Sequence, residues 1–173
     1  DPQEIAQEMG ISRVPLVEDM LPRDGARRLL ALAELRFNGF LSASYHGRSL
    51  RLWWREGRLS SVEGYGAILG HLLALRGVGQ EVADELATVS ENALGRAVQR
   101  GCIAPEKMDA WMEKCRFEAC IHLVQEVPGF TIEERKDLPV DRLPLADPRP
   151  MILVGIIENY SAAAAWAIGG GAP

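Results

Sequence analysis

The hydrophobic period of this chain changes from helical to two-residue alternation near residue 40 and returns to helical after residue 63. Alternation of apolar and polar residues is typical of half-buried strands, and a short turn containing glycine joins antiparallel neighbours. The pattern predicts an antiparallel β-meander with one apolar face packed on a helix and the other face in water. Its strands are separated by turns at Gly47-Arg48 and Glu56-Gly57.

Apolar residues at helical spacing lie on both sides of this meander. Before it, residues 24–37 have that spacing, and Asp24 offers an oxygen for the N-cap. After it, Ser90 is expected to cap one helix, and Pro105 is expected to open the longest helix of the chain. The expected helices after the meander cover residues 65–77, 80–86, 90–101 and 105–127.

A fourth alternating segment, residues 130–133, follows a Pro-Gly break and predicts a further strand. The predicted fold class is therefore α+β: a small antiparallel β-meander packed on helices, with a helical insertion and a C-terminal helix. The chain begins with Asp1 rather than Met, which indicates a segment of a longer protein. A lead-in, a domain and a tail are expected at residues 1–21, 22–160 and 161–173.

The C-terminal part of the chain is apolar after an extended connector. Residues 137–150 contain four prolines and predict the connector, whereas residues 151–157 are continuously apolar. A membrane span needs about 20 consecutive apolar residues, and Glu158 and Asn159 interrupt this segment at its midpoint. We therefore expect no membrane span but a docking helix, packed against this domain or a partner, including a second copy of the chain.

Charge is distributed unevenly along the sequence. The chain has 19 Lys and Arg against 24 Asp and Glu, for a formal net charge of −5. Residues 21–60 contain eight arginines and three acidic residues, so this segment is positive and the remainder is strongly negative. Proteins that bind duplex nucleic acid usually have a far more basic domain, so we expect no nucleic acid partner. An acidic protein surface or a small anionic ligand fits this layout better.

The chain carries none of the common motifs for nucleotide, metal or hydrolase chemistry, and no cofactor or metal is expected. Cys102, Cys115 and Cys120 cannot pair completely and form no CxxC motif, which indicates reduced thiols in a cytoplasmic protein. Cys120 and His122 are two apart on a helix, so they face different directions. A cysteine-dependent enzyme stays as an alternative, with Cys115 or Cys120 as its nucleophile. His46 and His71 are expected to have no special role.

The segment around Trp53 and Trp54 combines aromatic and basic residues. Alternation places Trp54 in the core and Trp53 on the solvent face, between the side chains of Arg51 and Arg55. Trp and Arg dominate binding hot spots, so an exposed Trp53 would be an interface anchor. Alternatively, Trp53 lies over arginine stems and covers the sheet without any partner. The predicted partner-binding residues are Arg48, Arg51, Trp53, Arg55 and Arg58.

The order of these segments resembles the PATAN-like domain, a bacterial regulatory module often joined to response-regulator receivers. The resemblance covers about residues 21–160 and depends on a pattern of glycines and apolar residues at Gly39, Leu41, Gly57, Gly129 and Phe130. It implies a non-enzymatic signalling or scaffolding role in motility, cell polarity or development, with a receiver domain or a small Ras-like GTPase as partner. It implies no catalytic residue.

The helical insertion separately resembles the amino-terminal domain of secretion and pilus ATPases. Some of those domains bind cyclic di-GMP through repeated RLG segments, which makes a cyclic dinucleotide sensor the alternative function. Here Ile68 and Ala93 stand where the repeat would have its arginines. The two copies of the repeat in this chain are Leu69-Gly70 followed by Gly77, and Leu94-Gly95 followed by Gly101.

Overall fold

The structure, a computed structural model, describes residues 25–89, 91–125 and 129–168, with side chains as far as Asn159. The expected lead-in, the Asp24 cap and the last residues of the tail lie outside these ranges. The chain forms an α+β fold with a four-stranded sheet, as the sequence predicts. The elements are α2 (Gly25–Glu34), β1 (Gly39–Tyr45), β2 (Arg48–Arg55), β3 (Arg58–Glu63), α3 (Gly66–Leu75), α4 (Gln80–Thr88), α5 (Ala93–Gln99), a 3-10 helix (Pro105–Lys107), α6 (Met108–Gln125), β4 (Thr131–Glu134) and α7 (Arg149–Ile168).

The sheet is antiparallel throughout, with the strand order β3-β2-β1-β4. The meander supplies the first three of these strands, and β4 returns to pair with β1 after the helical insertion. In this register Phe40 lies opposite both Trp53 and Glu133, and Leu41 lies opposite Leu52. The expected strand at residues 130–133 is thus confirmed, one residue further along.

Both hairpins of the meander turn through a residue pair with left-handed backbone. The first pair is His46 and Gly47, with φ angles of 48° and 77°, one residue before the predicted turn. The second is Glu56 and Gly57, with φ angles of 50° and 74°. Two consecutive positive φ angles define the type I′ turn, whose twist matches that of the strands it joins.

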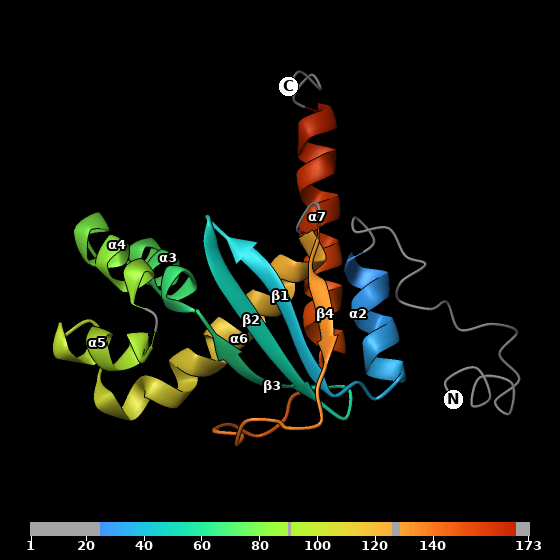
Figure 1. The fold of residues 1–173 in the computed structure, drawn as a ribbon. Helices are drawn as coiled ribbons and strands as arrows, with labels where there is room; N and C mark the ends of the chain where they lie inside the picture. Colours follow the sequence, from blue (N-terminus) through green and yellow to red (C-terminus); the bar gives the residue numbers. More distant parts are fainter. Residues whose placement is uncertain (1–24, 90, 126–128, 169–173) are drawn as a thin grey trace, which may run out of the picture.

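Helix α6 packs across one face of the sheet, and α2 and α7 pack beside it (Figure 1). The core forms where apolar side chains from these elements meet. Leu41, Leu52 and Trp54 contribute from the sheet, and Cys120 and Leu123 contribute from α6. Helices α3, α4 and α5 lie together on the opposite side of the sheet from α2 and α7 (Figure 1). The 3-10 helix connects this group to α6.

The helix ends differ from expectation in two places. Helix α5 is capped by Asn92, whose Oδ1 accepts a hydrogen bond from the Gly95 amide at 3.1 Å, and not by the predicted Ser90, which lies outside the described residues. The segment opened by Pro105 begins as a 3-10 turn, and its helix has 18 residues, whereas α7 has 20 and is the longer helix. A 3-10 turn is a common start for an α-helix.

Candidate functional site

Trp53 and Trp54 project to opposite faces of β2, but both are buried. Trp54 is fully buried within the core, whereas only 9% of Trp53 is exposed although it lies outside that core. The Trp53 ring packs on Phe40 from β1, with 4.9 Å between ring centroids. The Arg51 guanidinium lies 4.1 Å above the Phe40 ring, and that of Arg135 lies 5.6 Å above it. The prediction of an exposed Trp53 is therefore wrong, because Phe40 and arginine side chains share its face.

The four arginines predicted beside Trp53 do not form one compact patch. Arg48 and Arg55 stand at opposite ends of β2, roughly 23 Å apart for a strand of this length. Arg51 pairs with Glu63 at 3.8 Å. Among the described residues, Arg48 and Arg58 form no ion pair, and both are exposed. Arg58 lies at the β2–β3 turn, so the two free guanidinium groups are far from each other.

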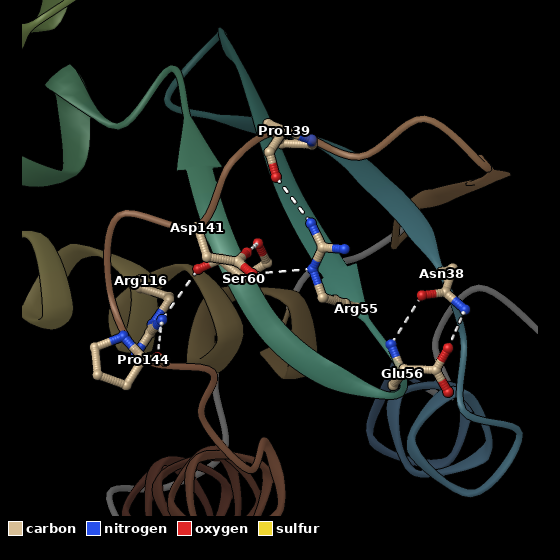
Figure 2. A network of polar contacts seen from close by, with 8 residues as sticks. All are labelled: Asn38, Arg55, Glu56, Ser60, Arg116, Pro139, Asp141 and Pro144. Atoms are coloured by element: carbon tan, nitrogen blue, oxygen red, sulfur yellow. Dashed lines mark hydrogen bonds and ion pairs between the residues drawn. The ribbon is translucent and has the colours of Figure 1, made fainter.

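Arg55 instead binds the connector between β4 and α7, residues 135–148 (Figure 2). Its Nε donates to Asp141 Oδ2 at 2.9 Å, and its Nη2 donates to the Pro139 carbonyl at 3.0 Å. Asp141 also accepts from the Ser60 hydroxyl. Ala146 forms two backbone hydrogen bonds with Leu59 of β3. The connector is thus held along β2 and β3, and its three prolines, Pro139, Pro144 and Pro148, have no amide N–H that needs a partner.

Arg116 of α6 holds the connector from the core side. Its Nη1 donates to the carbonyl oxygens of Ser60 and Pro144, at 3.0 and 2.9 Å (Figure 2). Only 2% of this residue is exposed, and its Nε has no hydrogen-bond partner. Burial lowers the pKa of Arg116, while the charges of Glu113 and Asp141 oppose that shift. No carboxylate among the described residues lies within ion-pair distance of this guanidinium.

Helix α7 has one packed face and one exposed apolar face. On the packed face Ile152 is buried, and Gly155 lies so close to α6 that an added Cβ would stand 2.8 Å from the Val124 Cβ. On the other face Leu153, Ile156 and Ile157 are 57%, 41% and 55% exposed. The C-terminal half of α7 extends beyond the sheet and α6 (Figure 1). The predicted docking helix is therefore confirmed against its own domain, and it leaves a stripe of three aliphatic side chains in water.

Within the described ranges, no helix combines the length and the apolar character that crossing a membrane requires. Glu158 interrupts the apolar sequence of α7, although the helix itself is continuous there. Its carboxylate accepts a hydrogen bond from Gln125 of α6 at 3.2 Å. This contact uses the polar side of α7, next to the aliphatic stripe.

The two cysteines proposed as nucleophiles are buried in the core. Burial raises the pKa of Cys115 to about 12, with a further contribution from Glu118, and burial alone raises that of Cys120 to about 12. Both side chains are therefore neutral thiols at pH 7, whereas a catalytic cysteine reacts as a thiolate. Cys102 is partly exposed. This geometry gives the cysteine-enzyme alternative no support.

Iodoacetamide should therefore label Cys102 and leave Cys115 and Cys120 unmodified, both at pH 7 and at pH 9. An unfolded thiol has a pKa near 8.5. Because the folded state holds each thiol proton up to about pH 12, each buried cysteine contributes to the free energy of unfolding. This contribution is fully present below about pH 8.5 and is lost as the pH rises toward 12. Mass spectrometry of the alkylated peptides measures this, with urea-unfolded protein as the control in which all three react. Fast labelling of Cys115 or Cys120 in the folded protein would contradict it.

The rings of His46 and His122 both contact Tyr45, and the ring of His71 lies next to that of His46. The Tyr45 ring lies 4.6 Å from that of His46 and 4.8 Å from that of His122, and the His46 and His71 rings are 6.3 Å apart. His122 Nε2 lies 2.8 Å from the carbonyl oxygen of Ser44. No sequence pattern marks this cluster, because its members come from the β1–β2 turn, α3 and α6. In the part of the chain that the structure describes, no group of such side chains is arranged to hold a metal.

No family model, no curated protein and no solved structure matches this chain. The resemblance to PATAN-like domains stays a prediction. Two of its motif glycines have clear structural reasons. A Cβ on Gly57 would lie 2.5 Å from the carbonyl oxygen of Ala33, and one on Gly39 would lie 2.1 Å from that of Glu133. Gly57 therefore lets the β2–β3 turn reach α2, and Gly39 lets β4 reach β1.

Proposed function

We propose that this chain is a non-enzymatic protein-interaction module of bacterial signal transduction, and that it pairs with a second copy of itself through α7. The observation that supports the pairing is the exposed stripe of Leu153, Ile156 and Ile157. The cellular context is a proposal from the resemblance: a cytoplasmic scaffold in motility or cell-polarity control, with a receiver domain or a small Ras-like GTPase as its further partner.

A second copy fits the stripe because the two surfaces are identical. Helix α7 has 20 residues, about 30 Å, and only part of that length packs on the domain. After Glu158 the helix contains no charged residue as far as Ile168. A two-fold axis places both stripes against each other, so one contact covers both apolar surfaces. A larger signalling protein would also cover these apolar surfaces. The stripe itself, however, has only aliphatic side chains, so it carries no feature that selects such a protein.

The non-enzymatic part of the proposal is supported by the state of the candidate nucleophiles, since Cys115 and Cys120 are buried and protonated. For the further partner, Arg48 and Arg58 remain exposed and able to meet acidic side chains. Trp53 and Arg55 are committed to their own chain. The cyclic dinucleotide alternative gains nothing from the insertion, because Ile68 and Ala93 are core residues, and arginine there would be buried too.

Changing Leu153 and Ile157 together to glutamate is expected to abolish self-association. Two charges at the ends of the stripe would stay unpaired when a partner covers it. Sedimentation velocity at roughly 100 µM measures the effect, since an interface with a micromolar Kd is occupied at that concentration. The matched control is Leu75→Glu, which adds a charge at a 72% exposed leucine of α3. This control should remain dimeric. A wild-type chain that sediments as a monomer would contradict the proposal.

A further inference from the structure

A cleft of about 730 Å³ lies between β3, the helical insertion, α6 and the connector. This volume is in the range of small-molecule sites. The cleft lies away from the α7 stripe and has no part in the proposed pairing. Its lining is mixed, with arginines, hydroxyls, an amide and two glutamates among apolar residues. The polar and charged residues that line it include Ser61, Glu63, Glu91, Asn92, Arg116 and Arg142.

Arg116 gives this cleft a buried positive charge that, among the described residues, has no carboxylate in direct contact. Its guanidinium is nearly fully buried, and its two hydrogen bonds go to neutral carbonyl oxygens rather than to a carboxylate. Its Nε has no partner. Taking a charge out of water is expensive unless an opposite charge accompanies it. An anion in the cleft would supply that charge in the low-dielectric surroundings where the attraction is strongest.

Further donors line the same cleft. Arg142 is exposed and forms no ion pair among the described residues. Asn92 uses its Oδ1 for the α5 cap, so its amide NH2 group is available to a ligand. The hydroxyl of Ser61 adds another donor. Two guanidinium groups, a hydroxyl and an amide offer more donors than the two oxygens of a carboxylate can take, but they suit the three oxygens of a phosphate group.

The two glutamates define what the rest of the ligand must be. Glu63 is paired with Arg51, while Glu91 is exposed. Their charges repel a long polyanion but accept hydrogen bonds from N–H groups of a small molecule. We propose that the cleft binds a small phosphate ester, with the phosphate at Arg116 and Arg142 and hydrogen-bond donors of the ligand toward Glu91.

Calorimetry with inorganic phosphate and with adenosine monophosphate tests this proposal, in chloride buffer of matched ionic strength. Both should bind saturably, with adenosine monophosphate at least as tight as phosphate. Arg142→Ser should weaken both about tenfold, which is the usual size of losing one charged hydrogen bond. Arg58→Ser is the matched control, because it removes an exposed arginine without an ion pair from the β2–β3 turn, and it should bind as the wild type does.

Three results would overturn the proposal: no saturable binding up to about 10 mM, an equal loss in Arg58→Ser and Arg142→Ser, or binding of phosphate with exclusion of adenosine monophosphate. Arg116→Lys adds an independent measurement, since it keeps the charge but loses the forked donors. It should weaken binding more than Arg142→Ser does. Circular dichroism of each variant confirms that the fold is intact. Because α7 is untouched, the dimer should persist in every variant, so the two proposals fail independently.

Discussion

Trp53→Ala is expected to lower the free energy of unfolding by about 3 kcal/mol, at the lower end of the range for removing a buried aromatic side chain. Trp53 is 91% buried and packs on Phe40, whose own ring is covered by the Arg51 guanidinium. The loss should be smaller than for Trp54→Ala, because Trp54 lies inside the main core. Urea unfolding followed by circular dichroism measures both, through a lower midpoint with an unchanged slope.

The matched control is Arg58→Ala, on an exposed side chain of the same sheet without an ion pair. Surface substitutions of this kind usually change the free energy of unfolding by less than about 0.5 kcal/mol. If Trp53→Ala behaved like Arg58→Ala, the side chain would be an exposed anchor for a partner, as alternation alone predicts. The packing of Trp53 on Phe40 would then be contradicted.

The fate of Trp53 shows what a strand pattern can and cannot predict. A two-residue period assigns side chains to faces, and it placed Trp53 and Trp54 on opposite faces correctly. It does not say what covers each face. Phe40 is opposite Trp53 only in the observed register, and Arg135 reaches Phe40 from a segment about a hundred residues away. The alternative of a covered Trp53 agrees with the structure only in part, because Phe40 packs on Trp53 while the guanidinium groups of Arg51 and Arg135 lie over the Phe40 ring.

The helices and strands were predictable because each has a local signal. Gly77 and Gly101 end α3 and α5 with left-handed backbone, and the type I′ turns contain the glycines that the meander pattern indicated. The connections between elements had no such signal. Arg116 bonds to backbone oxygens of Ser60 and Pro144, and any residue type supplies a carbonyl, so no sequence pattern marks these partners.

The internal repeat of the insertion shows most clearly that the same local sequence can have different roles in tertiary packing. Its two glycines, Gly70 and Gly95, occupy the same place after leucine but meet different neighbours. A Cβ on Gly70 would lie 2.5 Å from the backbone oxygen of Ala83, where α3 and α4 touch. A Cβ on Gly95 would meet the side chain of Asn92, which is able to rotate away.

Gly70→Ala is therefore expected to destabilise the chain by about 1–3 kcal/mol, because the two helices must separate to admit the methyl group. Gly95→Ala should change the free energy of unfolding by less than about 1 kcal/mol. It gains helix propensity of about 1 kcal/mol and loses a cap of similar value when Asn92 moves.

Urea unfolding of the two variants measures the difference between their free energies of unfolding. Asn92→Ala then separates the gain in helix propensity at Gly95 from the loss of the cap. If Asn92→Ala alone costs about 1 kcal/mol, then adding Gly95→Ala to it should restore stability, because the methyl group no longer meets an amide. Gly70→Ala has no such rescue, since a backbone oxygen cannot be substituted away. Equal losses at Gly70 and Gly95 would mean that the repeat is maintained by one shared packing role, and that the close approach of α3 to α4 is not what requires its first glycine.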